Sequence, residues 1–398
     1  MAKKILVIDD SALMRRVISD IINEGDDYEV AAIAKDGVEG FDLIVSNPNL
    51  YSAVILDINM PKMNGLELLK ELQKNRIEQT VIVVSTVAKQ GAKETIQALE
   101  YGAFDFVTKP ENYLETKGVA FKEAIHKMLD IATSSRASIE RTRVIRSRTT
   151  PLSATSRTTT TSRLGQNSSN ADRASAINAL RQRSMERNVA PAKIEASSLR
   201  NVKKNKKKIV ALACSTGGPK SLQQVIPVLP KNLDCGVVVV QHMPAGFTAS
   251  LAQRLDEMSQ VKVKEAAQGD IIKKGVVYIA PGGFHLKIVK VGTEYKIDLN
   301  KEPAIEGLRP CANIMYESLE NSDFDEITCV VLTGMGADGT KGIKGLVDKK
   351  KKIYVIAQDE DSCVVYGMPK AIAKTGLVNE VVPLNRIANS ITKNVGVI

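Results

Sequence analysis

The sequence lacks an uninterrupted apolar run of the roughly 18–20 residues that a membrane-spanning helix requires. Its N-terminus passes from a basic dipeptide directly into a strand-like run, without the apolar stretch and cleavage site of a secretory signal. The five cysteines are widely spaced and form no CxxC pair, which argues against a zinc knuckle or a disulfide framework. We therefore expect a cytoplasmic protein that does not insert into membranes.

Length and composition point instead to several folded domains. The chain has 398 residues, enough for two or three domains, and 43% of them are hydrophobic, which supplies folded cores. The net charge of +10 first suggests a nucleic-acid partner. However, residues 136–208 hold 18 basic and 4 acidic residues, a net charge of +14, so the rest of the chain carries −4. The excess belongs to one segment, and we expect no nucleic-acid partner.

Residues 3–131 alternate between short apolar runs and segments of helical periodicity. Runs such as residues 5–8, 53–56 and 81–84 are typical of strands that are buried on both faces of a parallel sheet. A helix-period segment follows each run. This pattern predicts five βα units that form an open, doubly wound parallel sheet.

The composition then changes twice along the chain. Ser and Thr make up 18 of the 38 residues from 133 to 170, so we expect a flexible, basic Ser/Thr/Arg-rich linker over 132–207. From Ile209 onward, apolar runs again alternate with helix-period segments. We therefore expect a second α/β domain over 208–395, with a mostly parallel sheet.

Polar residues lie where the N-terminal strands end. The first strand is followed by Asp9 and Asp10, the third by Asp57, the fourth by Ser85 and the fifth by Lys109. Because the carboxyl ends of parallel strands meet at one edge of a sheet, these side chains should converge. Close carboxylates need a counter-ion, and Mg²⁺ prefers such oxygen ligands. A carboxylate beside Mg²⁺ and a lysine is suited to accept a phosphoryl group.

With these residues and the run from Leu56 to Pro61, the segment 3–125 resembles the receiver domain of two-component response regulators. The resemblance implies phosphorylation of Asp57. It also implies a sensing role for Ser85 and a pairing role for Lys109. The implied magnesium site is made by Asp9 (partly through water), Asp10, Asp57 and the carbonyl of Asn59.

In the second domain a serine, a histidine and an aspartate each follow an apolar run. Ser215 lies in the turn from Cys214 to Pro219, His242 follows the next strand, and Asp338 lies in a later glycine-rich loop. Together they supply the nucleophile, base and orienting carboxylate of a hydrolytic triad. Their order differs from that in α/β-hydrolases, chymotrypsin and subtilisin, and the G-x-S-x-G elbow is absent.

Each of these residues also has an ordinary structural interpretation. A histidine in a turn is often structural, and Asp338 would serve as a plain helix cap. Cys214 is a rival nucleophile, although strand alternation places its side chain opposite that of Ser215. His285 begins a strand, where contact with a substrate and a structural role are equally consistent with its position.

Residues 208–395 are similar to the catalytic domain of the chemotaxis protein-glutamate methylesterase family, CheB. The similarity rests on the runs Ser215 to Gly218, Gln241 to Pro244, Ile279 to Gly282 with His285, Thr333 to Gly339, and Gln358 to Pro369. It implies that Ser215 is the nucleophile, His242 the general base and acid, and Asp338 the orienting carboxylate. The implied oxyanion and substrate contacts are Thr216, Gly217, Met335 and His285.

The order of receiver, linker and esterase matches this family along the whole chain. It implies a phosphorylation-activated methylesterase that also deamidates protein glutamines, with methyl-accepting chemotaxis receptors as substrates and a chemotaxis histidine kinase as phosphodonor. No cofactor is implied for the esterase reaction, and we expect a monomer whose unphosphorylated receiver covers the Ser215 cleft. Two alternatives without hydrolase activity stay open: a phosphorylation-controlled binding protein, whose glycine-rich turns cradle a phosphate, and a DNA-binding response regulator.

Overall fold

The structure, a computed structural model, describes residues 2–86, 88–110, 116, 118–148 and 206–398. The segments Met1–Arg143 and Lys206–Ile398 together form one compact unit. Among the described residues, no helix has the length and apolar character needed to cross a membrane.

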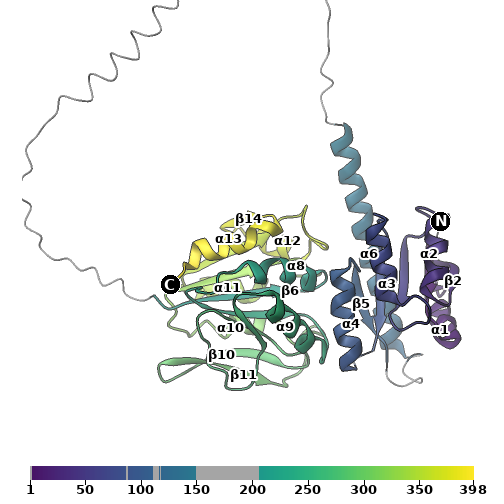
Figure 1. Cartoon of the computed structure of the whole chain (residues 1–398). Coiled ribbons are helices and arrows are strands. Elements are labelled where there is room, and N and C mark those ends of the chain that lie inside the picture. Colours follow the sequence, from purple (N-terminus) through teal and green to yellow (C-terminus); the bar gives the residue numbers. More distant parts are fainter. Residues whose placement is uncertain (1, 87, 111–115, 117, 149–205) are drawn as a thin grey trace, which may run out of the picture. The chain divides into compact units, whose positions relative to one another are not determined.

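The N-terminal part of this unit is a parallel sheet with helices on both faces (Figure 1). Its elements are β1 (Lys3–Ile8), α1 (Ala12–Ile22), β2 (Tyr28–Ala34), α2 (Gly37–Ser46), β3 (Ala53–Asp57), α3 (Gly65–Lys74), β4 (Val81–Ser85), α4 (Lys89–Glu100), β5 (Asp105–Thr108) and α6 (Val119–Arg148). The strands lie in the order β2-β1-β3-β4-β5, and each neighbouring pair is parallel. The predicted doubly wound sheet is confirmed.

Alternation along the strands builds a core on each face of this sheet. Leu6 and Ile8 of β1 belong to the cluster that includes side chains of α2, α3 and α4. Ile5 and Val7 belong to the opposite cluster, which includes side chains of α1 and α6. Because both faces are covered, the strands read as continuous apolar runs, and only their ends are free to carry polar groups.

Helix α6 extends further than the sequence pattern predicts. We expected a helix near residues 117–131 followed by a flexible linker, but α6 continues to Arg148. Residues 132–148 contain neither Gly nor Pro, and Pro151 is the first residue of this segment that disrupts a helix. The expected linker therefore begins with helical residues, and the rest of that prediction, over 149–205, lies outside the described residues.

The C-terminal part contains a larger parallel sheet. Its elements are β6 (Lys208–Cys214), α8 (Gly218–Val225), η1 (Ile226–Val228), β7 (Gly236–Gln241), α9 (Phe247–Met258), β8 (Lys262–Glu265), β9 (Val276–Ile279), β10 (His285–Val291), β11 (Glu294–Asn300), α10 (Ala312–Glu317), β12 (Glu326–Val331), α11 (Thr340–Asp348), β13 (Ile353–Gln358), α12 (Met368–Ala373), β14 (Glu380–Val382) and α13 (Leu384–Val395). The sheet order is β14-β13-β12-β6-β7-β9-β8, and every neighbouring pair is parallel. The antiparallel hairpin β10–β11 lies outside this sheet, so the predicted mostly parallel α/β domain is confirmed.

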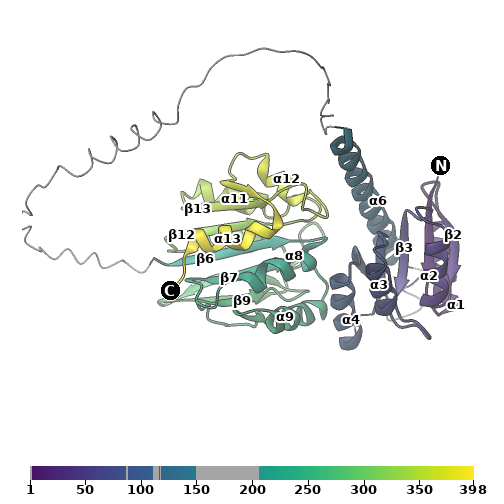
Figure 2. The same ribbon diagram turned by 45° about the horizontal axis from the view of Figure 1, so that its top comes forward.

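The central strand β6 divides its side chains between two layers. Val210, Leu212 and Cys214 join the cluster with α8, α9 and α13, whose helices Figure 2 shows along one face of the sheet. Ile209 and Ala211 join the opposite cluster, with α10, α11, α12 and the hairpin. The strand order reverses beside β6, because β7 lies on one side and β12 on the other. Ligand crevices form at such reversals, outside the carboxyl ends of the strands.

Candidate active site

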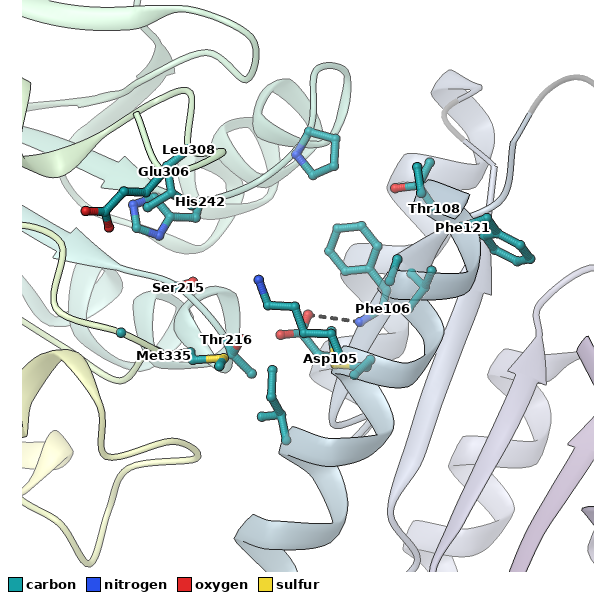
Figure 3. Close-up of a pocket in the computed structure, with 18 of the residues that line it drawn as sticks. Asp105, Phe106, Thr108, Phe121, Ser215, Thr216, His242, Glu306, Leu308 and Met335 are labelled. Atoms are coloured by element: carbon teal, nitrogen blue, oxygen red, sulfur yellow. Dashed lines mark hydrogen bonds between the residues drawn. The ribbon is translucent and has the colours of Figure 1, made fainter. Parts of the chain in front are cut away.

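The three predicted triad residues meet at this reversal. Ser215 directly follows β6, His242 directly follows β7, and Asp338 lies in the loop between β12 and α11. All three line one pocket of about 1120 Å³, together with Thr216 and Met335 (Figure 3). Neighbouring parallel strands thus bring together residues that are far apart in the sequence.

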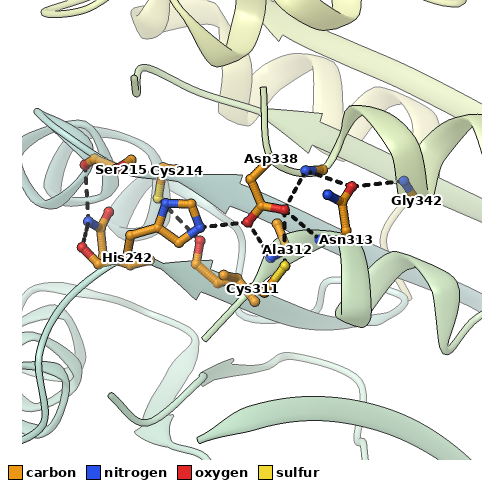
Figure 4. Close-up of polar contacts among 11 residues, drawn as sticks. Cys214, Ser215, His242, Cys311, Ala312, Asn313, Asp338 and Gly342 are labelled. Atoms are coloured by element: carbon orange, nitrogen blue, oxygen red, sulfur yellow. Dashed lines mark hydrogen bonds and ion pairs between the residues drawn. The ribbon is translucent and has the colours of Figure 1, made fainter. Parts of the chain in front are cut away.

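His242 and Asp338 form a buried pair. Their side chains are 8% and 4% exposed, and His242 Nε2 lies 2.8 Å from Asp338 Oδ2 (Figure 4). An ionised carboxylate only accepts hydrogen bonds, so Nε2 carries the proton in this pair. The other ring nitrogen, Nδ1, is then the one that is free of a proton in the neutral ring. Nδ1 is therefore the ring nitrogen that can accept a proton.

Asp338 is held as a carboxylate by hydrogen bonds from a distant segment. It accepts from the backbone amides of Ala312 and Asn313 at 2.6 and 2.9 Å, and from the thiol of Cys311 at 3.2 Å. Burial opposes its ionisation, but the hydrogen bond and charge of His242 and the two amides outweigh burial and lower the pKa of Asp338 to about 2. The carboxylate therefore stays charged at neutral pH and can stabilise an imidazolium.

The plain helix-cap interpretation does not describe Asp338. The N-cap of α11 is Gly339, and α11 has no side-chain cap. Asp338 instead faces the first residues of α10, and Asn313 Oδ1 fixes the loop by accepting from the Gly339 and Gly342 amides at 3.0 and 2.8 Å. Cys311 and Asn313 were missed by sequence reasoning, because no local pattern links them to a loop about 25 residues further along the chain.

The turn at Ser215 leaves backbone donors free. The Ser215 amide donates to the Thr333 carbonyl at 3.0 Å, which fixes this turn against the end of β12. Gly217 has a φ of +74°, and a Cβ there would lie 2.5 Å from Val364, so glycine is required. The amides of Thr216 and Met335 donate no hydrogen bond to any described residue. Two such amides beside the nucleophile suit an oxyanion.

Two other predicted residues lie away from the pocket. Cys214 is fully buried, its Sγ lies 3.9 Å from the Val240 carbonyl, and burial raises the pKa of its thiol well above the usual range. The thiol is therefore a poor nucleophile. His285 is also fully buried, and its Nε2 donates to the Pro303 carbonyl at 3.1 Å. Its geometry favours the structural alternative over contact with a substrate.

The N-terminal carboxylates converge as their strand ends predict. Asp9, Asp10 and Asp57 offer oxygens that lie within 4.8 Å of one another. Lys109 Nζ lies 2.8 Å from both Asp9 and Asp57. Burial raises the pKa of Asp57, while Lys109 opposes this rise. Three carboxylates and one ammonium leave negative charge to neutralise, and such a donor set fits Mg²⁺.

The remaining receiver residues surround this cluster. Ser85, at the end of β4, is buried, and its hydroxyl donates to the Gly91 carbonyl at 3.3 Å. Asn59 is exposed in the loop that follows β3. Arg15 donates to the carbonyls of Asp9 and Asp10 at 2.7 and 3.0 Å, a role that sequence reasoning did not assign. These bonds hold the loop after β1 in place.

Fold and sites together define a class of protein: a doubly wound domain with a carboxylate cluster at its strand ends, joined to an α/β domain whose pocket is lined by a serine, a histidine and an aspartate. A family model described as CheB methylesterase matches residues 210–391, and one described as response regulator receiver domain matches residues 5–117. The chain belongs to the CheB methylesterase family with an N-terminal receiver domain.

Relatives match along nearly the whole chain. A protein-glutamate methylesterase/protein-glutamine glutaminase of Pyrococcus horikoshii is 38% identical over 99% of this chain and 94% of its own. One of Clostridium acetobutylicum is 38% identical over 98% of this chain and 97% of its own. The solved structure of the Thermotoga maritima CheB methylesterase catalytic domain is 43% identical in sequence and has a TM-score of 0.46. The match covers 48% of this chain and 99% of the solved domain.

The burial of Cys214 generates a prediction about the rival nucleophile. Cys214→Ala should keep most of the esterase activity, because the thiol is neutral and faces the core rather than the pocket. Cys329→Ala, in the neighbouring strand β12, is a matched control, since Cys329 is equally buried. Methanol release from a methylated protein substrate is the measurement. A near-complete loss in Cys214→Ala, with normal activity in Cys329→Ala, would restore the thiol as a candidate.

Proposed function

We infer that this chain is a protein-glutamate methylesterase and protein-glutamine glutaminase under the control of its receiver domain. The observation that carries this inference is the convergence of Ser215 with the His242–Asp338 pair in one pocket, in a chain that matches relatives of that name over nearly its full length. The bonds cleaved are the methyl ester of a protein glutamate and the side-chain amide of a protein glutamine. No comparison supports the binding-protein or DNA-binding alternatives.

The acylation step follows from the arrangement of the triad. Ser215 Oγ attacks the ester carbonyl while His242 Nδ1 takes the hydroxyl proton, since Nε2 is already engaged by Asp338. The carbonyl oxygen becomes an oxyanion, which the amides of Thr216 and Met335 stabilise. The tetrahedral intermediate then breaks its C–O bond to methanol, which leaves with the proton from His242. The product is an acyl-enzyme on Ser215.

Deacylation repeats the same proton transfers with water. His242 takes a proton from the water that attacks the acyl carbonyl, and it returns this proton to Ser215 Oγ as the C–O bond to the enzyme breaks. A glutamate carboxylate is released. With a glutamine substrate, ammonia leaves in place of methanol, and the remaining steps are identical. Asp338 keeps its charge throughout and stabilises the imidazolium in each step.

We propose that Asp57 accepts the phosphoryl group from a chemotaxis histidine kinase. Lys109 lies close enough to pair with the phosphoryl oxygens, and Ser85 would turn its hydroxyl from Gly91 toward them. Asp10, Asp57 and the Asn59 carbonyl, with Asp9 partly through water, would hold Mg²⁺, which supplies charge neutralisation during transfer. We further propose methyl-accepting chemotaxis receptors as the substrates, and a monomeric enzyme in the cytoplasm.

Contacts inside the compact unit support control by steric cover. Arg254 of α9 binds both carboxylate oxygens of Glu100, with Nη2–Oε1 and Nη2–Oε2 distances of 2.8 and 3.0 Å. The rings of Phe106 and Phe247 lie 4.5 Å apart. Asp105, from the end strand of the receiver sheet, lines the same pocket as Ser215 (Figure 3). Phosphorylation of Asp57 would weaken these contacts and open the pocket.

The assignment of the nucleophile is tested with Ser215→Ala. This variant should release no measurable methanol from a methylated receptor, because the acyl-enzyme cannot form, while Asp57 is phosphorylated at the wild-type level. Asp57→Asn should keep the basal rate of methanol release, but a phosphodonor should not raise this rate. Methanol release in Ser215→Ala at the wild-type rate would disprove the triad.

Charge reversal tests the cover. Glu100→Arg should raise the activity of the unphosphorylated enzyme severalfold, about 2- to 5-fold, since a partly exposed ion pair contributes roughly 1 kcal/mol or less. The double variant Glu100→Arg/Arg254→Glu restores the pair with reversed charges and should return the activity to the wild-type level. The phosphorylated forms serve as controls and should be equally active. If the unphosphorylated single variant stays at the wild-type level, this ion pair does not hold the pocket closed.

A second test uses pH. Burial raises the pKa of Asp105 to about 7, although amides of Phe106 and Gly217 and the Thr216 hydroxyl oppose the rise. An exposed aspartate has a pKa of about 4. The covered state therefore binds the Asp105 proton more tightly than the open state, so raising the pH through 7 weakens the cover. The ratio of unphosphorylated to phosphorylated activity should therefore rise from about pH 6 to about pH 8 in the wild type, and less in Asp105→Asn. Equal slopes in the two proteins would disprove this role of Asp105.

A further inference from the structure

Gln241, the last residue of β7, links the nucleophile to the general base. Gln241 is buried, with 1% of its surface exposed. Its Nε2 donates to the Ser215 carbonyl at 3.0 Å and to the His242 carbonyl at 3.1 Å. One amide group therefore uses both of its hydrogens on the backbones of two triad residues.

This link continues the sheet beyond its last strand pair. The ladder between β6 and β7 ends at the pair Cys214–Gln241, so Ser215 and His242 lie just past it. One further backbone bond, from the His242 amide to the Cys214 carbonyl at 3.1 Å, extends the pairing. Past that point the Gln241 side chain replaces backbone pairing, and it fixes the separation of the Ser215 and His242 carbonyls.

Packing alone does not explain a glutamine at this position. Gln241 Oε1 is buried and has no partner among the described residues, which costs free energy. A Cβ on Gly218 would lie 1.9 Å from this oxygen, so the side chain also restricts the turn to glycine. An apolar side chain of similar size would avoid the unpartnered oxygen. The two bonds of Nε2 are thus the feature that distinguishes glutamine here.

We propose that Gln241 is a positioning residue that sets the geometry between Ser215 and His242. The inference rests on the proposed esterase function. Gln241 is not among the residues that line the pocket, so its effect is on alignment and not on contact with a substrate. A displacement of about 1 Å between reacting groups lowers a rate by up to about 100-fold, so loosening this link should reduce kcat.

The experiment compares two buried glutamines in the full-length protein. Gln241→Met removes both donors and keeps the volume, so kcat for methanol release should fall about 10- to 100-fold with KM nearly unchanged. Its melting temperature should stay near that of the wild type, because the unpartnered oxygen is removed as well. Gln223→Met is the matched control, since Gln223 is also buried, lies on α8 and has an unpartnered Nε2. It should keep the wild-type kcat.

A second readout separates this inference from the proposed function. Labelling of Ser215 by a small fluorophosphonate should slow in Gln241→Met, since the probe reports the activated serine without a protein substrate. Wild-type protein that neither releases methanol nor takes up the probe would disprove the esterase function itself. If the wild type is active and Gln241→Met has the same kcat and labelling rate, the positioning role is overturned. A rise in the KM of Gln241→Met with unchanged kcat would overturn it as well. If Gln241→Met does not fold, Gln241→Asn keeps the amide but shortens its reach, and wild-type kcat in that variant overturns the inference.

Discussion

Parallel pairing of buried strands is the constraint on which both sites depend. A strand covered on both faces has no solvent-exposed side chains along its length, so polar groups are confined to its ends. Parallel neighbours end at the same edge, and the strand order reverses beside β1 in one sheet and beside β6 in the other. The carboxylate cluster around Asp57 and the pocket at Ser215 occupy these two edges. The same packing rule therefore gathers polar residues at one edge of each sheet.

Buried charge is handled differently at the two edges. In the receiver, Lys109 pairs with Asp9 and Asp57, and Asp10 adds a third carboxylate beside them. Burial raises the pKa of Asp57, and the cluster suits a divalent cation. In the esterase, one carboxylate is surrounded by donors, and the pKa of Asp338 is lowered to about 2. The first arrangement gains from the added positive charge of a divalent cation. The second has its donors within the protein, because Asp338 accepts from His242 Nε2 and from the α10 amides.

Much of this organisation could be predicted from residue patterns. Continuous apolar runs identified the central strands, and polar residues directly after them identified Asp57, Ser215 and His242 as candidate site residues. The end of helix α6 was harder to predict. The Ser/Thr-rich composition after residue 132 is typical of a linker, but no helix-breaking residue occurs before Pro151 and the helix continues to Arg148. Composition reports average preference, whereas a helix that is already formed continues until a residue opposes it.

By itself the sequence determined the two α/β domains, the chemical identity of the site residues and the strand ends on which they lie. Tertiary structure alone decided which distant groups support them: the α10 amides and Cys311 that hold Asp338, the buried position of His285, and the amide of Gln241 between Ser215 and His242. The physical reason is that these contacts join segments brought together by sheet order and packing. A periodic pattern specifies how each segment folds, but it carries no information about which hydrogen-bond partner lies across the crevice.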